Sequence, residues 1–396
     1  MNPRPSGARV SLRSLGRLRV SGAGLWGGFG LSASLVWFLV SVTPWGTWLA
    51  LLGAALAILP LALRRRHTRP EHRRRWTWIG VGLGTFVAII GTGLLVATPT
   101  GRPPQDSPVQ QHFVGGSAFP RFSVANVVPE IEQLNLGLQL LPFGDGLLTR
   151  DRARRLASFT TDYYRQMDRD PDFRSLGSAM GGAYADLLGG SYPAGHYYLY
   201  FPRSAPPGPR PAIVFLHGSA GNFKVYTWIW SRLAEQLGCV IIAPSFGFGF
   251  WDRPEAVETV RRALADAQTV VTLDPRRLFL AGLSNGGLGV SRVAAAMPGA
   301  FCGCILISPV LADAMTDDPE FQRKWAGRPM LFLTGEVDDR VPVDYVRERV
   351  RRLHTGGVLT TLVTYPGEDH FLFFSQRDPV LQAIARWMQT ADPHLP

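Results

Sequence analysis

The chain has 396 residues, which is enough for one large domain or two smaller ones. Its formal net charge is +11, but twelve of its 41 basic residues and only one of its 30 acidic residues lie in positions 1–75. The rest of the chain is balanced at 29 residues of each sign. A basic surface for nucleic acid is not required to explain the charge, so no nucleic-acid partner is expected.

Long uncharged stretches separate the arginines of positions 1–75. Residues 20–63 carry no charge, and at about 1.5 Å per helical residue these 44 residues span roughly twice the ~30 Å core of a bilayer. The turn sequence TPWG at 43–46 divides this stretch, and a third uncharged run covers 76–101. These runs predict a membrane region at 1–100 with three transmembrane helices, near 24–43, 46–63 and 77–99.

The positions of the arginines predict the orientation of these helices. The N terminus and the loop RRRHTRPEHRRR at 64–75 are arginine-rich, which is typical of cytoplasmic segments. Three spans then place the residues after about 100 outside the cytoplasm, in a multi-pass protein of the cell membrane whose N terminus is cytoplasmic. Two alternatives stay open. One is a cleaved signal peptide followed by buried core helices, and the other is insertion of one hairpin, which would invert the later residues.

The segment that follows the uncharged runs divides into two parts. Residues 101–118, GRPPQDSPVQQHFVGGSA, are rich in Pro, Gly and polar residues, which predicts a linker. Residues 119–195 are harder to interpret. Within them, 149–170 begins with a threonine suited to cap a helix and has an amphipathic pattern. We interpret 119–195 as an accessory, lid-like segment.

Residues 196–396 have a regular alternation of strand-like and helix-like runs. The strand-like runs are continuously apolar, which is typical of a parallel sheet that is covered on both faces. The prediction is an α/β fold with a mostly parallel sheet and helices on both faces. After two early strands in 196–218, we expect strands at 239–244, 277–282, 302–308, 329–335 and 359–365, and helices at 224–238, 254–270, 285–297, 343–354 and 376–390.

The stretch AGLSNGGLGVS at 281–291 lies where an apolar strand ends and a helical run starts. A chain that turns at once from strand to helix needs a sharp corner, and side chains beside its apex would clash. Glycines at 282 and 286 relieve that clash and leave the hydroxyl of Ser284 exposed at the end of the sheet. Ser284 is therefore the candidate nucleophile. The competing interpretation is a glycine-rich turn with a solvated serine.

A serine needs a base to take its proton, and the base needs an acid to orient it. Among the eight histidines, His370 follows the last apolar strand in a loop that can reach the serine, and it is the candidate base. His217 also leaves a strand, but it is expected to brace its loop. The loop LFLTGEVDDRVP at 331–342 follows the penultimate strand and offers Glu336, Asp338 and Asp339 as competing acids.

Hydrolysis through an activated serine also needs N–H donors for the negative oxygen that develops on the substrate. The backbone N–H of Asn285, at the start of the helical run, is one candidate. The loop after the strand in AIVFLHGSAGNF at 212–223 supplies the second, with the N–H of Ser219 placed best and that of Ala220 as the alternative.

The order serine, acid, histidine on alternating strands and helices resembles the α/β-hydrolase superfamily of serine esterases, over about residues 190–392. LDPRRLFLAGLSNGG at 273–287 is similar to polyhydroxybutyrate depolymerases and feruloyl esterases, and its SNGG resembles prolyl oligopeptidases. GEVDDRVP resembles the acid loop of the superfamily, and the matching aspartate is Asp338. YPGEDHF at 365–371 resembles the histidine loop of dienelactone-hydrolase-like and prolyl-peptidase-like members, with His370 as the match. The propeller of prolyl oligopeptidases has no counterpart here, and the spans at 1–100 are not part of the usual pattern.

The resemblance implies a membrane-anchored serine hydrolase for a small-molecule, lipid or polymer ester, with Ser284, His370 and Asp338 as its catalytic triad. Acyl transfer to an envelope sugar or lipid, peptide cleavage, and a non-catalytic membrane-tethered binding protein are the alternatives. No metal-ligand spacing and no phosphate-binding loop occur, so neither a metal nor a cofactor is expected. The loop PSFGFGFWDRPE at 244–255 has four aromatic residues that either form an apolar pocket or only pack within the loop: Phe246, Phe248, Phe250 and Trp251.

Three cysteines, Cys239, Cys302 and Cys304, complete the inventory of reactive side chains. Cys302 and Cys304 are two residues apart in a strand-like run, so they face the same way and a bridge between them would be strained. We expect all three to be small buried residues rather than parts of a disulfide or a metal site.

Overall fold

A computed structural model describes residues 22–64, 70–203 and 208–391. The chain divides into two compact units, the first ending at Leu94 and the second beginning at Leu95. The first unit holds three helices: α1 (Gly22–Val40), α2 (Pro44–Arg64) and most of α3 (Pro70–Ala97). Thr43 accepts a hydrogen bond from the N–H of Gly46 through its side chain (3.0 Å), so the predicted turn between the first two helices also caps the start of α2.

The three predicted transmembrane segments lie mostly in helices, and within the described residues one apolar run meets the length and apolarity of a membrane span. That run is Trp76–Ala97 in α3, whereas the apolar runs of α1 and α2 are shorter, at Gly27–Val40 and Pro44–Pro60. The described residues therefore provide one candidate span, and the other two spans stay predictions. The arginine-rich N terminus and residues 65–69 of the predicted cytoplasmic loop lie outside the described residues.

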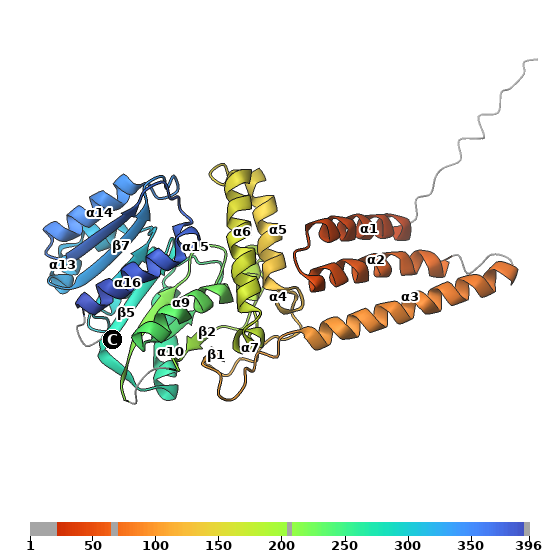
Figure 1. The fold of residues 1–396 in the computed structure, drawn as a ribbon, viewed down its shortest axis with the longest axis horizontal. Helices are drawn as coiled ribbons and strands as arrows, with labels where there is room; N and C mark the ends of the chain where they lie inside the picture. Colours follow the sequence, from red (N-terminus) through yellow and green to blue (C-terminus); the bar gives the residue numbers. More distant parts are fainter. Residues whose placement is uncertain (1–21, 65–69, 204–207, 392–396) are drawn as a thin grey trace, which may run out of the picture. The chain divides into compact units, whose positions relative to one another are not determined.

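The second unit is built on one eight-stranded sheet with the order β1-β2-β4-β3-β5-β6-β7-β8 (Figure 1). The strands β3 to β8 pair in parallel, while β1 and β2 are antiparallel additions at one edge. The predicted α/β fold with a mostly parallel sheet is confirmed. The strands are β1 (Val109–Phe113), β2 (His196–Tyr200), β3 (Arg210–Leu216), β4 (Val240–Pro244), β5 (Leu273–Leu283), β6 (Gly303–Ile307), β7 (Pro329–Gly335) and β8 (Leu359–Tyr365).

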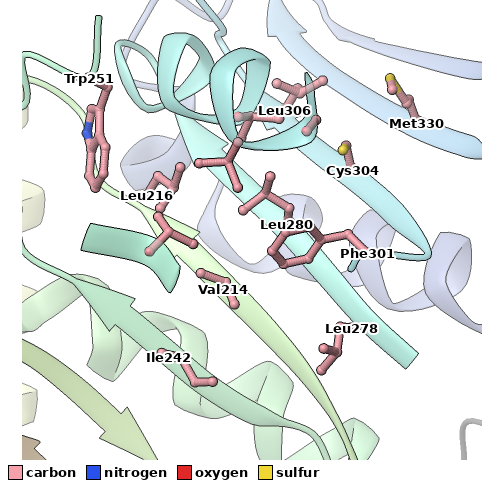
Figure 2. Close-up of a cluster of buried hydrophobic side chains, with 14 of the residues drawn as sticks. Val214, Leu216, Ile242, Trp251, Leu278, Leu280, Phe301, Cys304, Leu306 and Met330 are labelled. Atoms are coloured by element: carbon pink, nitrogen blue, oxygen red, sulfur yellow. The ribbon is translucent and has the colours of Figure 1, made fainter. Parts of the chain in front are cut away.

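Alternate residues of the parallel strands enter two different cores, because successive side chains point to opposite faces of a sheet. Figure 2 shows one core, where Val214 and Leu216 of β3 lie with Leu280 of β5 and Leu306 of β6. The same cluster includes side chains of α10 (Glu255–Val270), α11 (Gly286–Ala296) and α14 (Val343–Thr355).

The opposite face of the sheet is covered by α9 (Lys224–Leu237) and α16 (Arg377–Ala391), which contact each other (Figure 1). Here Phe215 of β3 contacts Trp230 of α9 (5.3 Å between ring centroids), and Phe279 of β5 contacts Trp387 of α16 (6.0 Å). Helices on both faces bury the central strands β3, β4, β6 and β7 almost entirely, which explains why these strands are continuously apolar in sequence. The short helices α12 (Asp313–Asp317), α13 (Pro319–Trp325) and α15 (Leu372–Ser375) complete this part of the chain.

The segment expected to be a linker contains a strand. Residues 109–113 form β1, which pairs antiparallel with β2 along its whole length. Val109 is buried, and the ring of His112 stacks on Tyr197 (5.0 Å). An edge strand with one partner needs little hydrophobic alternation, so its glutamines and flanking prolines had the composition of a linker. The linker interpretation of 101–118 is wrong at these residues.

Residues 119–195, called here the accessory segment, are mostly helical, with less irregular chain than their glycines indicated. Thr149 caps the predicted amphipathic helix by accepting a hydrogen bond from the N–H of Arg152 (3.3 Å). The helices are α4 (Val124–Val127), α5 (Glu130–Leu140), the 3-10 turn η2 (Leu141–Phe143), α6 (Arg150–Met167), α7 (Pro171–Arg174) and α8 (Met180–Leu188).

A buried carboxylate fastens the accessory segment to the sheet domain. Glu130 accepts hydrogen bonds from the hydroxyls of Tyr164 and Ser178 and from the N–H of Lys224 (2.9 Å), the first residue of α9. Burial raises the pKa of Glu130, and the nearby Lys224 ammonium opposes that shift. A buried polar group is costly unless its partners satisfy it, so these contacts fix the position of α5 against α9.

The three cysteines are free. Cys239 and Cys304 are buried as predicted, whereas Cys302 is partly exposed.

Candidate active site

Ser284 lies at a sharp corner between β5 and α11. Its backbone is left-handed, with φ of 53°, which is strained for any residue other than glycine. Neighbouring chain holds it there: its N–H donates to the carbonyl of Ile307 (2.9 Å), and its carbonyl accepts from Gly287 (2.8 Å) and Val310 (3.0 Å). The corner is thus fixed by backbone hydrogen bonds on both sides of the serine.

Two glycines make this corner possible. A Cβ atom on Gly282 would lie 2.5 Å from the carbonyl oxygen of Gly286, and a Cβ atom on Gly286 would overlap the carbonyl oxygen of Leu216. No side chain fits at either position, because backbone packs directly on backbone. The spacing Gly-x-Ser-x-Gly is therefore a geometric requirement of a corner that presents Ser284.

The structure brings Ser284, His370 and Asp338 together. His370 Nε2 is 2.9 Å from Ser284 Oγ, and His370 Nδ1 is 2.8 Å from Asp338 Oδ2. A carboxylate only accepts hydrogen bonds, so Nδ1 carries the proton and Nε2 is free to accept from the serine hydroxyl. The arrangement is a serine next to a base that an acid orients.

The Asp338 carboxylate is fully buried and is satisfied by three donors. Its Oδ1 atom accepts from the N–H groups of Arg340 (2.9 Å) and Val341 (2.8 Å), and its Oδ2 atom contacts His370. The two competing acids lie elsewhere. Asp339 pairs with Arg152, and Glu336 accepts from the hydroxyl of Thr364 (2.8 Å).

The two expected oxyanion donors flank Ser284. A Cβ atom on Gly218 would lie 3.4 Å from Ser284 Cβ, so the loop that carries Ser219 passes directly beside the serine. The Asn285 side chain donates to Ser219 Oγ (2.8 Å) and ties this loop to the start of α11. Within the described residues, neither the Ser219 nor the Asn285 backbone N–H donates a hydrogen bond, and Ala220 takes a left-handed φ of 79°.

His217 braces the loop that carries Ser219, as expected from its position in the sequence. Its Nε2 atom accepts from the N–H of Phe246 (3.1 Å), so Nδ1 carries the proton and donates to the carbonyl of Gly218 (2.7 Å). The Trp251 indole N–H donates to the carbonyl of His217 (2.8 Å). Burial lowers the pKa of His217 to about 4, so this imidazole is neutral near pH 7.

Ser284 and His370 open into a largely apolar cavity of about 410 Å³. Phe371, Phe373 and Phe374, which follow His370, line one side. Of the aromatic loop at 246–251, Phe248 lines the cavity, whereas Trp251 is fully buried in the core and stacks on Phe246. Both interpretations of that loop therefore hold, each for different residues.

The accessory segment supplies much of the remaining cavity wall. These residues are missing from the sequence prediction because an amphipathic helix does not reveal which surface its apolar side faces. They are Gln133, Leu134, Gly137, Leu138, Leu141, Asp145, Leu148, Leu156, Thr160, Met180, Ala183, Tyr184 and Leu187.

Ion pairs join the accessory segment to both loops that carry the acid and the base. Arg152 of α6 pairs with Asp339, next to Asp338, and its Nε atom lies 3.6 Å from Asp369, next to His370. Arg155 lies 3.4 Å from Glu368, and Asp145 pairs with Arg340. One helix thus spans the gap between the two loops. Within the described part of the chain, no cluster of three or more His, Cys, Asp or Glu residues has a metal-binding arrangement.

Residues 207–333 match the family model described as serine aminopeptidase, S33. No curated protein matches the sequence. Three similar solved structures each correspond to 50% of this chain: Est1E from Butyrivibrio proteoclasticus (18% identity, 93% of that chain, TM-score 0.41), esterase Est2 from the Planctomycetes species Thermogutta terrifontis (20%, 85%, 0.40) and the metagenomic carboxylesterase EstE1 (21%, 84%, 0.41).

The sheet order, the serine corner and the family match together define the class of protein. The chain carries an α/β-hydrolase domain of the serine hydrolase type, so the predicted resemblance and the prediction of an enzyme are confirmed.

The glycine corner makes a prediction about stability. Gly286→Ala should lower the free energy of unfolding by about 1–3 kcal/mol, because the added methyl overlaps a carbonyl oxygen that cannot move independently. Gly299→Ala is the matched control, since a Cβ atom there meets open space. Urea denaturation of the two variants in detergent compares them, and equal midpoints would contradict this account of the corner.

The ion pairs of α6 make a prediction about catalysis. Arg152→Ala should slow acylation of Ser284 by a small activated ester about tenfold with KM within twofold, because the two loops lose the cation that they share. Arg152→Lys should recover part of the rate. Arg154→Ala on the same helix is the control, since Arg154 is exposed and its ion pair is with Asp151 on that helix. Equal rates for the two alanine variants would show that Arg152 does not position the loops.

The buried His217 makes a prediction about pH. The unfolded chain takes up a proton near pH 6.5, whereas the folded chain does so only near pH 4, so the free energy of unfolding falls as the pH is lowered through this window. His217→Asn should reduce that slope by up to about 1.4 kcal/mol per pH unit. His354→Asn, at an exposed position, is the control. Denaturation at pH 6.5, 5.5 and 4.5 measures the slopes, and identical slopes would refute the prediction.

Proposed function

We propose that this chain is a membrane-anchored serine hydrolase that cleaves carboxylic esters outside the cytoplasm through a Ser-His-Asp triad. The proposal rests on one observation above all: the continuous hydrogen-bonded series Ser284–His370–Asp338 at the edge of an apolar cavity. The three side chains are a nucleophile, a base and an acid, in the order that acyl transfer requires.

The proposed reaction proceeds in two halves. Ser284 Oγ attacks the ester carbonyl while His370 Nε2 takes the hydroxyl proton, and the imidazolium is held by the Asp338 carboxylate. The N–H groups of Ser219 and Asn285 stabilise the negative carbonyl oxygen. Collapse of this intermediate breaks the ester bond, and His370 gives its proton to the leaving alcohol. Water then attacks the acyl-enzyme with His370 as base, which releases the acid and restores Ser284.

The cavity favours esters over peptides with a free amino end. Such peptides carry an ammonium group, which needs an acidic partner when it is buried. Asp145 is the one acidic residue among the described residues that line the cavity, and it is already paired with Arg340. The match to a serine aminopeptidase family keeps peptide cleavage as the second candidate.

The length and apolarity of Trp76–Ala97 support membrane attachment. The arginines on the N-terminal side of this run support a location outside the cytoplasm for the residues that follow it. Alkaline carbonate extraction tests attachment. Protease added to sealed vesicles of known orientation tests location, and cleavage beyond residue 100 is expected from the non-cytoplasmic side only.

Substitution of the triad tests the activity. Purified full-length protein should hydrolyse soluble esters, Ser284→Ala should lose at least about a thousandfold in kcat, and Asp338→Asn about 10⁴-fold, because the amide cannot hold the required tautomer. Asp344→Asn is the control, since its carboxylate is exposed and remote from His370 in sequence.

A panel of matched substrates separates the alternatives. An amide and an ester with the same acyl group should differ strongly in rate, in favour of the ester. Comparable cleavage would favour a peptidase, and transfer to an added alcohol in preference to water would favour an acyltransferase. Retention of full ester hydrolysis by Ser284→Ala would contradict the proposed nucleophile.

A further inference from the structure

Exposed apolar side chains of the second unit are concentrated in the accessory segment. Of the large hydrophobic residues exposed in the described part of 98–391, eight lie in 119–195 and three in the much longer remainder. Six of the eight form what we call the apolar rim: Leu140, Leu141, Phe143, Leu147, Leu187 and Leu188. An exposed group of this kind marks a surface that meets an apolar partner.

The apolar rim borders the mouth of the cavity that holds Ser284. Leu141 and Leu187 line the cavity and are also about half exposed (48% and 55%), so they lie where it opens. Phe143 and Leu188 extend outward from them and are among the most exposed, at 73% and 83%. Strongly exposed apolar residues therefore lie next to residues of the cavity wall in the chain, and that cavity holds the nucleophile.

The chain emerging from α3 is bound to the same accessory segment. Thr98, one residue beyond the end of α3, accepts a hydrogen bond from Arg121 (3.2 Å), and the N–H of Gly101 donates to Ser175 (3.0 Å). A Cβ atom on Gly101 would overlap the Phe119 ring, so this attachment is close. If α3 spans a bilayer, Thr98 leaves it at the lipid surface, and the accessory segment is held within a few residues of that surface.

Arginines beside the exposed apolar groups suit the same surface. The guanidinium of Arg150 lies over the Phe143 ring (5.0 Å), and that of Arg121 lies over Phe122 (5.2 Å), a residue that is 62% exposed. Aromatic side chains with cationic groups stacked on them suit the headgroup region, where the ring enters the lipid and the cation meets phosphate.

From these observations we propose that the apolar rim docks into the lipid bilayer that α3 spans, so that the cavity takes water-insoluble esters directly from the membrane. The proposal rests on the proposed function, and it names the source and class of the substrate: lipid-soluble esters whose acyl chains pass over the rim into the cavity. A bilayer is the occupant that the tether supplies, because the accessory segment cannot leave its surface.

Lipid contact is tested directly by fluorescence quenching in the full-length protein reconstituted into phosphatidylcholine–phosphatidylglycerol vesicles. Phe143→Cys and Leu188→Cys are labelled with bimane, and the parent protein is subtracted as background for the native cysteines. Lipids with a spin label on the upper acyl chain should quench both probes at least twofold. Leu359→Cys is the matched control, since Leu359 is exposed (57%) but lies in β8, and it should show no quenching.

The outcomes separate failure of this proposal from failure of the proposed function. Flotation of the vesicles reports membrane attachment, and covalent labelling of Ser284 reports the hydrolase site. No quenching at 143 and 188, in protein that floats and is labelled, would overturn lipid docking. Protection of both probes that depends on protein density in the vesicle would also overturn it, in favour of contact between two copies of the chain.

Activity provides a second test. The triple variant Leu140→Ser, Phe143→Ser, Leu188→Ser changes three rim residues that do not line the cavity. It should hydrolyse a long-chain ester embedded in the vesicles about tenfold more slowly, and a short water-soluble ester within twofold of the parent. Leu359→Ser should leave both rates unchanged. Equal loss for both esters, or no loss for either, would overturn the proposal.

Discussion

Direct contact of backbone on backbone around Ser284 is the constraint on which the rest of the site depends. The serine is held in a left-handed conformation by hydrogen bonds to Ile307 and Val310, and this is possible only because Gly282 and Gly286 have no side chains. This strained backbone conformation persists because it lies at the end of the buried central strands, whose packing holds it in place. Ser284 therefore projects from a rigid edge, and its partners need only come from the neighbouring strand ends.

The accessory segment contributes to the site in a different way from the sheet. It provides no member of the triad, but it forms much of the cavity wall and places arginines against both loops that carry the acid and the base. Glu130 attaches this segment to the sheet domain through buried hydrogen bonds. The geometry of the triad and the shape of the cavity are thus coupled through α6, so changes in one are expected to affect the other.

The features that were predicted correctly are those that a short stretch of sequence determines by itself. The serine corner, the histidine loop and the sheet follow from glycine spacing and apolar runs, and the structure places His370 and Asp338 as the resemblance implied. The choice between Asp338 and Asp339 depended on that resemblance, because either carboxylate suits an acidic loop. Strand β1 and the cavity wall were missed for a physical reason: both depend on which distant surface a segment packs against, and an edge strand or amphipathic helix does not encode its partner. Of the three spans that the uncharged runs predicted, the described residues support the one in α3, and the other two stay predictions.

The most direct test of the account is to locate the covalent adduct of a fluorophosphonate on the full-length protein by peptide mass spectrometry. An activated serine displaces the fluoride and keeps the phosphonyl group, whereas an ordinary serine does not react at this rate. The account predicts a single adduct, on Ser284, that is lost in His370→Ala although that variant retains the serine. An adduct on another serine such as Ser219, or none on folded protein with an accessible cavity, would contradict the claim that Ser284 and His370 form a working nucleophile and base.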